Sequence, residues 1–162
     1  MSRPDLSSPR ALAILAGGAS AAMLAAALFF QAVGFAPCEL CILQRWPHLA
    51  AALVAAAVAL TGFRRVWGLL GLIAAVVATV LAGYHAGVEQ GWWAGPVACS
   101  GGLGDLSALS PQDLLARIQA APVVRCDQPE WFFLGLTMAA WNTILSAALV
   151  VVWTLSLRRP AR

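Results

Sequence analysis

The sequence predicts an all-α membrane protein, a bundle of four transmembrane helices with a short amphipathic helix in its long outer loop. The chain is 61% hydrophobic and only 10% of its residues are charged, against about 25% in ordinary soluble domains. Its apolar residues gather in four stretches, each near the ~20 residues that a helix needs to cross a bilayer. We expect one integral membrane domain over residues 1–162.

Four apolar stretches account for the predicted transmembrane helices. None has an Asp, Glu or Arg in its interior, where a charge would cost about 2.5–3.5 kcal/mol or more. The second is the shortest, and its prediction depends partly on the Arg64-Arg65 pair that follows it. Small residues are abundant in the stretches and let helices approach closely in lipid. The stretches cover residues 11–33, 46–63, 66–86 and 132–157, and the outer loops cover residues 34–45 and 87–131.

A cleaved signal peptide is the alternative for the first stretch, because an Arg-flanked, Ala-rich apolar run is typical of such peptides. The run over residues 11–33 is longer than the about 7–15 apolar residues of an ordinary signal peptide. It also leads to Cys38 without a polar spacer. We therefore expect a membrane span here.

The arginines predict which side of the membrane each loop faces. Seven of the ten lie on the side of the two termini with a single acid, Asp5, whereas the other side has three arginines and six acids. Because cytoplasmic loops carry an excess of basic residues, we expect both termini in the cytoplasm and all four cysteines at or beyond the outer face. The seven arginines are Arg3, Arg10, Arg64, Arg65, Arg158, Arg159 and Arg162. The tryptophans expected at the outer interface are Trp46, Trp92, Trp93 and Trp131, and those expected at the inner one are Trp67 and Trp153.

The formal charge of +3 does not indicate a nucleic-acid partner. All ten basic residues are arginines, and no run of them is flanked by aromatic residues that would stack on bases. The lipid bilayer is the expected surroundings, and no nucleic acid is expected to bind.

The long outer loop contains the predicted amphipathic helix. Ser110 is a favourable cap, Pro111 suits the first helical position, and Asp113 adds an acid to the first turn. The helix should end near Pro122 and is too short to span. It would lie flat on the outer membrane surface or pack on the loop itself. The apolar residues that recur with helical spacing are Leu114, Leu115 and Ile118.

The four cysteines form two pairs in the predicted outer region. Cys38 and Cys41 directly follow the first span, and Cys99 and Cys126 lie in the long loop, where a Gly-rich flank would present Cys99 to an outside partner. Two structural disulfides are one interpretation, because thiols outside the cytoplasm tend to be oxidised. A bond across Cys38 and Cys41 would stabilise little, whereas one between Cys99 and Cys126 would close about 28 residues and contribute about 3–4 kcal/mol. Short Cys-x-x-Cys pairs occur where a disulfide opens and closes.

Metal binding is a further interpretation of four thiols, since zinc and copper(I) both accept thiolate ligands. The second pair lacks close ligand spacing, and the chain has two histidines, His48 and His85. We therefore predict no metal.

Arg45, four residues after Cys41, is the strongest candidate for a supporting side chain. It would either extend to the lipid headgroups or act on the chemistry, because a nearby cation favours thiolate. A guanidinium also donates hydrogen bonds to a reducible carbonyl group. Electrons that leave a dithiol within lipid need a diffusible acceptor, and a membrane quinone is the candidate.

His85 ends the third stretch near the same outer face. It would hydrogen-bond a quinone oxygen or relay a proton, or else be bonded by a neighbouring helix. His48 is a weaker candidate. Gln31 is either a ligand contact or an interhelical hydrogen bond, and Asn142 is interpreted as interhelical packing.

These residues together resemble the disulfide bond formation protein B (DsbB) family. The resemblance covers nearly the whole chain beyond the N-terminal tail, and it rests on the four-span layout and three segments. They are Pro37-Cys38-Glu39-Leu40-Cys41 followed by Gln44-Arg45, Gly83-Tyr84-His85 with Gly91-Trp92-Trp93, and Cys99 with Val123-Val124-Arg125-Cys126-Asp127.

The resemblance implies a four-helix oxidase of the bacterial inner membrane that accepts electrons from the reduced periplasmic dithiol oxidase DsbA and passes them to ubiquinone or menaquinone. Cys99 would form the mixed disulfide with the partner, and Cys126 would react with Cys38. Cys41 would lie against the quinone with Arg45 beside both, and His85 would lie near the quinone. The cysteines would then face the periplasm.

Three other functions remain open. A quinone reductase of the vitamin K epoxide reductase type also has four spans and a Cys-x-x-Cys, but its motif is on the last span, whereas Cys38 and Cys41 follow the first. A non-catalytic membrane subunit with structural disulfides would account for the cysteines without redox turnover. A metal chaperone would instead bind copper or zinc in stoichiometric amounts.

Overall fold

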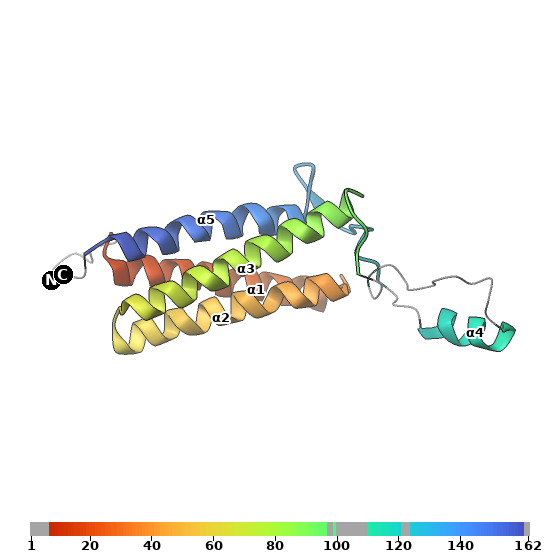
Figure 1. Ribbon diagram of the computed structural model, residues 1–162, viewed down its shortest axis with the longest axis horizontal. Helices are drawn as coiled ribbons and strands as arrows, with labels where there is room; N and C mark the ends of the chain where they lie inside the picture. Colours follow the sequence, from red (N-terminus) through yellow and green to blue (C-terminus); the bar gives the residue numbers. More distant parts are fainter. Residues whose placement is uncertain (1–6, 97–98, 100–109, 121–123, 161–162) are drawn as a thin grey trace.

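The computed structural model describes residues 7–96, 99, 110–120 and 124–160, without the side chains of Leu114, Arg117, Ile118 and Ala120. Four long helices lie side by side in this part of the chain, each antiparallel to the one before it (Figure 1). Each is long and apolar enough to cross a membrane, so the chain is a multi-pass membrane protein and the predicted fold class is confirmed. The helices are α1 (Pro9–Ala32), α2 (Glu39–Thr61), α3 (Arg65–Glu89) and α5 (Met138–Arg158).

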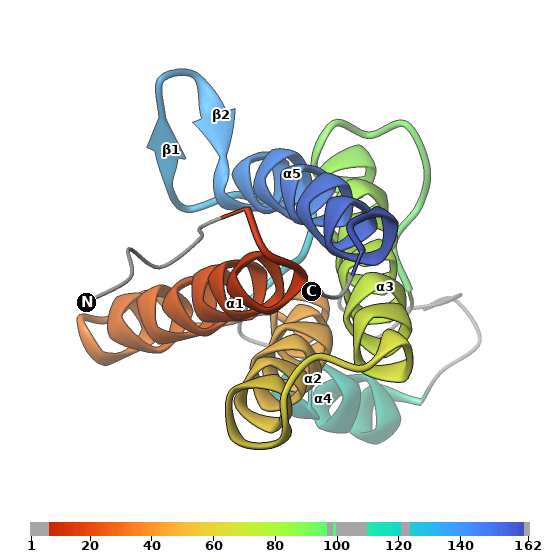
Figure 2. The same cartoon turned by 90° about the vertical axis from the view of Figure 1, so that its left-hand side faces the viewer.

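The four helices form a ring in which each packs against two neighbours. Viewed along the bundle, α1, α2, α3 and α5 follow one another around the ring, and α5 closes it against α1 (Figure 2). Glycines make the contacts close. A Cβ at Gly17 of α1 would overlap Ala55 of α2, and a Cβ at Gly68 of α3 would crowd Leu157 of α5. Close approach through small residues is how helices associate in lipid.

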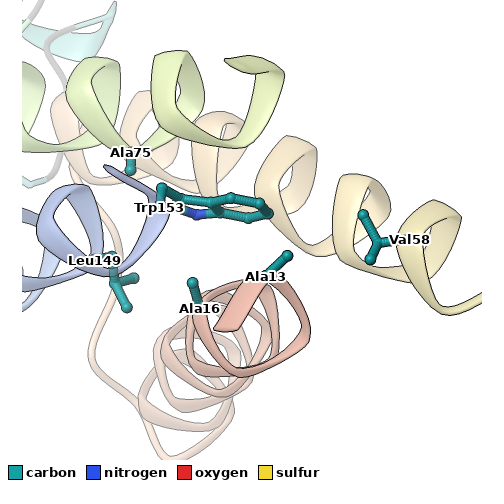
Figure 3. Packing of buried hydrophobic residues seen from close by; sticks show 6 residues of the cluster. All are labelled: Ala13, Ala16, Val58, Ala75, Leu149 and Trp153. Carbon is teal, nitrogen blue, oxygen red and sulfur yellow. The ribbon is translucent and has the colours of Figure 1, made fainter. Parts of the chain in front are cut away.

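Trp153 fills the centre of the bundle. Figure 3 shows its indole ring between α1 and α3, with side chains of all four helices around it. The side chain is 0% exposed, so the expectation of an interfacial anchor was wrong. The ring fits because Gly71 of α3 lies directly against it, and a Cβ there would overlap the indole. The buried residues around it are Ala13, Ala16, Val58, Ala75 and Leu149.

Replacing Gly71 with alanine should destabilise the bundle. The added methyl group would force Trp153 off its position in a filled core, and overpacking of this kind costs about 1–3 kcal/mol. Gly18→Ala is the matched control, because a Cβ at Gly18 has nothing within 4 Å. Thermal unfolding in detergent micelles should show a lower midpoint for Gly71→Ala only. Equal midpoints for both variants would contradict the close packing.

α2 begins earlier than the apolar stretch over residues 46–63 suggested. Its first residue is Glu39, and the Cys38 thiol caps it by accepting a hydrogen bond from the Cys41 backbone N–H at 3.2 Å. Cys41 and Arg45 therefore lie on a helix rather than in a loop. Since residues three, four and seven apart share a helix face, Cys41, Gln44, Arg45 and His48 point to similar sides of α2.

A β-hairpin precedes α5, whose first residue is Met138. Strands β1 (Phe132–Phe133) and β2 (Leu136–Thr137) pair antiparallel. The two turn residues between them, Leu134 and Gly135, have φ of 51° and 78°, as a tight hairpin turn requires. The Thr137 hydroxyl then caps α5 by accepting from Ala140 N at 3.1 Å. The hairpin thus holds Thr137 at the end of the bundle where α3 ends.

The loop helix α4 (Pro111–Ala120) begins at the predicted residue. The Ser110 hydroxyl accepts a hydrogen bond from the Asp113 backbone N–H at 3.2 Å and donates one to the Asp113 carboxylate at 2.6 Å. Figure 1 draws α4 beyond the end of the bundle at which α2 begins. The side chains of Leu114 and Ile118 lie outside the described part of the chain. The amphipathic character of α4 and its place on the membrane surface therefore stay predictions.

Several charged residues that predict the orientation lie beyond the described part of the chain. Arg3, Asp5, Asp105 and Arg162 lie outside it, as does the side chain of Arg117. Among the described residues, Arg10, Arg64 and Arg158 lie at one end of the bundle, opposite to the cysteines. The choice of which end faces the cytoplasm stays a prediction.

Candidate functional site

The Cys38–Cys41 pair lies at the first turn of α2 with both thiols free. Their Sγ atoms are 2.8 Å apart, longer than the about 2.05 Å of a disulfide. Helical geometry holds the two sulphurs together, because Cys38 caps the turn on which Cys41 lies. A small movement of either side chain closes the bond, as a reversible dithiol requires.

Cys99 and Cys126 form a disulfide, with their Cα atoms 5.1 Å apart. The Cys126 backbone N–H also donates to the Cys99 carbonyl at 3.2 Å. The two residues are only 1% and 2% exposed. The sequence suggested that Cys99 is presented to an outside partner, but the structure buries it. An incoming thiolate can reach Cys99 only after this segment moves.

The two cysteine pairs meet in one cluster, although they lie far apart in the sequence. Cys38, Cys99 and Cys126 are buried in this cluster, and the partly buried Cys41 packs against it. Leu40 and Val88 complete the buried part of the cluster, with Tyr84 and Val124 packed against it. Apolar packing at the end of the bundle thus brings the loop disulfide next to the dithiol on α2. Thiol–disulfide exchange needs this proximity, since one sulphur must attack another directly.

His85 of α3 bridges the two cysteine pairs. Its Nε2 atom is 3.6 Å from the Cys38 sulphur and 3.2 Å from the Cys126 carbonyl oxygen. Its Nδ1 atom is 2.8 Å from Nε2 of Gln44, which also donates to the Leu40 carbonyl at 3.1 Å. Since the Leu40 carbonyl only accepts, it fixes the Gln44 amide with its nitrogen towards His85. Nδ1 therefore accepts, and the ring proton is on Nε2.

This tautomer gives His85 a defined role at Cys38. The Nε2–H group faces the Cys38 sulphur, the Cys126 carbonyl and, at 3.8 Å, the Glu89 carboxylate. All three are acceptors when Cys38 is a thiolate. The nearest of the three is the Cys126 carbonyl oxygen, and the Cys38 sulphur itself donates to the Cys41 sulphur. His85 thus links the loop segment at Cys126 to the dithiol on α2.

Glu89 is a buried acid that the sequence analysis counted only as an outer charge. Its side chain is 5% exposed, and the Thr137 hydroxyl donates to it at 2.5 Å. The four-residue spacing between His85 and Glu89 places both on one face of α3, a signal that was available in the sequence. The position of Thr137 was not, because it depends on the hairpin.

A polar network continues from His85 into the bundle, between α2 and α5. The Asn142 amide donates to the Gln44 side-chain oxygen at 2.6 Å. The Asn142 side-chain oxygen in turn lies 2.9 Å from His48 Nε2 and 3.0 Å from the Ser146 hydroxyl. Asn142 is thus an interhelical hydrogen-bonding residue, as interpreted, but it also links two histidines. Gln44 was not recognised as a site residue.

An apolar cavity of about 440 Å³ opens beside the dithiol. Met23, Phe30 and Leu145 contribute to its largely apolar wall, and Cys38 and Cys41 line it together with Arg45, His48 and His85. A cavity of this size and character suits a small organic molecule with few polar atoms. A ligand bound there would contact the dithiol directly.

Arg45 lies at the cavity wall and is held from one side only. Its Nη1 donates to the Gln31 side-chain oxygen of α1 at 2.6 Å, so Gln31 makes an interhelical hydrogen bond. Its Nε atom is buried and has no hydrogen-bond partner among the described residues. A buried donor without an acceptor is unfavourable. The carbonyl oxygen of a ligand would provide that acceptor.

The geometry of the thiols favours redox chemistry over metal binding. Ligand atoms of Cys38, Cys41 and His85 lie within 4.8 Å of one another. Two thiolates on one tetrahedral zinc would be about 3.8 Å apart, given Zn–S bonds near 2.3 Å. The observed 2.8 Å between the two sulphurs is closer to the geometry of a disulfide.

An exposed ion pair flanks the buried Cys126. Arg125 donates two hydrogen bonds to the Asp127 carboxylate, at 2.9 and 2.6 Å. The Arg125 side chain holds the pKa of Asp127 below its ordinary value through these bonds. Both side chains are solvent-exposed, so the pair adds little stability. It keeps the segment around Cys126 polar on its outer side.

The structure therefore brings most of the predicted site residues together. Cys38, Cys41, Cys126 and His85 meet at the end of the bundle with Cys99, and Arg45 faces the adjoining cavity. The site residues that the sequence did not reveal are Gln44, Glu89 and Thr137. His48 was a weaker candidate, and Asn142 was interpreted as interhelical packing.

Comparison with known proteins agrees with this arrangement. The family model of the disulfide bond formation protein DsbB matches residues 9–156. The "Disulfide bond formation protein B" of Stutzerimonas stutzeri is 32% identical over 95% of this chain and 98% of its own length. The proteins of the same name from Paracidovorax citrulli and Methylococcus capsulatus are 30% and 35% identical, over 95% and 76% of this chain and 91% and 79% of their own lengths.

No solved structure matches the chain, so the relationship rests on sequence. The family match spans all four transmembrane helices and all four cysteines. With its dithiol, its neighbouring disulfide and its four membrane helices, the chain belongs to the disulfide bond formation protein DsbB family and is a membrane-embedded disulfide oxidoreductase.

Proposed function

We propose that the chain is a quinone-dependent thiol–disulfide oxidoreductase that reoxidises a DsbA-like dithiol oxidase in the periplasm. The observation that carries the proposal is the contact of the two cysteine pairs in one cluster, with the inner pair lining an apolar cavity. The proposed location is the bacterial inner membrane, with the cysteines on the periplasmic side and residues 1–162 acting as one membrane domain.

The proposed reaction first moves two electrons from the partner to the loop pair. A thiolate of the partner attacks Cys99, and the Cys99–Cys126 bond breaks to leave a mixed disulfide and a Cys126 thiolate. The partner's second thiol then displaces Cys99. The partner is now oxidised, and the loop pair is a dithiol.

The electrons then pass to the inner pair. Cys126 attacks Cys38 and breaks the Cys38–Cys41 disulfide, after which Cys99 displaces Cys38 and restores the loop disulfide. The product has a loop disulfide and a free inner dithiol, which is the arrangement that the structure describes. His85 supports this exchange by donating a hydrogen bond to the Cys38 thiolate as it leaves.

The cavity residues fit a quinone. The wall is mostly apolar, like a substituted ring with an isoprenoid tail, and the unpartnered Arg45 Nε provides a donor for one carbonyl oxygen. When bound, the quinone accepts two electrons and two protons from the inner dithiol and leaves as the quinol. Cys41 lines the cavity and is the proposed thiol on the quinone side, with Arg45 to support its thiolate, and Cys38 then closes the disulfide with Cys41. Ubiquinone and menaquinone both carry the required carbonyl groups.

The two alternatives are less well supported. A non-catalytic subunit with structural disulfides leaves the free Cys38–Cys41 pair and the cavity beside it without a role. In a vitamin K epoxide reductase-like enzyme the Cys-x-x-Cys is on the last span, whereas here it begins α2. The family match also favours the DsbB-type function.

The proposal is tested by counting quinones reduced per chain. The fully reduced protein, freed of reductant under argon, is mixed with a short-tailed ubiquinone, and the loss of quinone absorbance is measured. Two dithiols should reduce two quinones per chain, since each exchange moves two electrons. The double variant Cys99→Ala and Cys126→Ala should reduce only one. If the reduced protein leaves the quinone unchanged, the proposed function is wrong.

A further inference from the structure

His48 lines the same cavity and also has a buried polar atom without a partner among the described residues. The residue is 5% exposed, and its Nδ1 atom is buried without a hydrogen-bond partner among the described residues. It lies on α2 near Arg45, and both line the cavity beside Cys41. Buried polar groups are paired in almost all native structures, so this nitrogen indicates a ligand contact.

The hydrogen-bond network determines whether this atom donates or accepts. The Leu40 carbonyl orients the Gln44 amide, so the Gln44 oxygen points towards the Asn142 nitrogen. The Asn142 oxygen is then left to face His48 Nε2 at 2.9 Å. An amide oxygen only accepts, so the His48 proton must be on Nε2.

The Nδ1 atom of His48 consequently carries a lone pair and no proton, so it can only accept a hydrogen bond. The network has one direction throughout: His48 donates to Asn142, Asn142 to Gln44, and Gln44 to His85. The Ser146 hydroxyl also donates to the Asn142 oxygen at 3.0 Å, which agrees with that orientation. Asn142 and Gln44 thus fix the proton of His48 on Nε2 and leave the lone pair on Nδ1.

Two residues that line one apolar cavity therefore have unpartnered polar atoms of opposite kind. Arg45 Nε donates, whereas His48 Nδ1 accepts. A quinone offers only carbonyl acceptors and satisfies Arg45 alone. A quinol carries hydroxyl groups, and one of them would satisfy His48.

Building on the proposed quinone function, we propose that His48 Nδ1 accepts a hydrogen bond from a hydroxyl group of the quinol and so makes the cavity selective for the reduced ring. Tighter binding of the reduced form makes reduction of the bound ring more favourable. For a two-electron couple, a tenfold preference corresponds to about 30 mV in reduction potential. His48 would thereby help to draw electrons from the inner dithiol.

The test measures binding without turnover. In a background with Cys38→Ser and Cys41→Ser no electrons pass to or from the ligand, and quenching of tryptophan fluorescence under argon gives the dissociation constants of a short-tailed ubiquinone and its quinol. His48→Leu should weaken quinol binding about tenfold, the equivalent of one buried hydrogen bond. Binding of the quinone should change less than about twofold, because it makes no hydrogen bond to this atom.

Two further variants separate the ligand contact from a structural role. His48→Gln retains a side-chain acceptor and should keep most of the quinol affinity. Thr154→Ala removes a hydroxyl that donates to the Val150 carbonyl within α5, outside this network, and should leave both affinities unchanged. Equal weakening of both ligands by His48→Leu, or no weakening of either, would overturn the proposal. If the parent protein reduces quinone in the titration above, such a result rejects the role of His48 and leaves the proposed function standing. Failure of the parent to bind either ligand rejects both.

Discussion

Replacement of Cys41 by serine is expected to abolish quinone reduction completely. Serine is close to cysteine in size, but its hydroxyl cannot form a disulfide with Cys38. The inner pair of the variant therefore cannot supply the two electrons that reduce a quinone. Cys41 lines the cavity that the proposal assigns to the quinone, and no other thiol pair adjoins it. Rapid mixing of the fully reduced variant with a short-tailed ubiquinone should show no loss of quinone absorbance.

The same variant should retain its loop chemistry. The Cys99–Cys126 disulfide does not involve Cys41, so one equivalent of reduced partner should still be oxidised per chain in a single turnover. Thermal unfolding provides the control for folding, and its midpoint should match that of the parent. Normal steady-state oxidation of the partner by Cys41→Ser with quinone present would reject the proposed electron path.

Replacement of Cys126 by alanine is expected to give the second large effect, the accumulation of a mixed disulfide between Cys99 and the partner. In the proposed path Cys126 is displaced when the partner attacks Cys99, and it later carries the electrons to Cys38. The trap uses a partner whose second cysteine is replaced by alanine and whose remaining cysteine carries a disulfide to a small thiol. The Cys99 thiolate attacks that disulfide and the small thiol leaves. Neither protein then has a second thiol that could displace the linked pair, so the mixed disulfide persists. Acid quenching, alkylation and non-reducing electrophoresis of membranes would detect it, with mass spectrometry to identify the thiol that is bound.

Cys99→Ala is the matched control for this experiment. It leaves Cys126 as the single loop thiol in the same buried cluster, and it should trap little or no partner. Equal trapping by both variants would show that the two loop cysteines are interchangeable. That outcome would remove the division of roles between them.

The fold was predictable where composition and length alone decide it. The four apolar stretches became α1, α2, α3 and α5 because a long apolar run has no alternative in lipid to a helix with satisfied backbone groups. The predicted helix boundaries were wrong where an apolar run can form either the start of a membrane helix or another structure. Phe132 and Phe133 look like the start of a span, but Leu134 and Gly135 turn the chain into a hairpin.

The interior of the bundle was less predictable. Trp153 near a helix end resembles an interfacial anchor, and only its partner Gly71 on another helix reveals it as a core residue. The link between Gln44 and Asn142 likewise depends on the register of α2 against α5. Such a register is set by packing between helices, and no periodicity within one helix contains it.

The site was predictable in its reactive groups and not in their surroundings. Cys38, Cys41, Arg45 and His85 stood out by type and spacing, because few other polar residues occur in these helices. The burial of Cys99 was not foreseen. A glycine-rich flank predicts freedom of the backbone, but it carries no information on what packs against the chain there.

The burial of the cysteines has a consequence for leakage. Small thiols and oxidants in the surrounding solution would react with solvent-exposed cysteines and change their oxidation state without the partner protein. Cys38, Cys99 and Cys126 are all less than 5% exposed, so a dissolved thiol such as glutathione has no direct access to them. Only a protein that displaces the residues packed over these three cysteines should react with them. Their burial thereby separates them from the redox state of the surrounding solution.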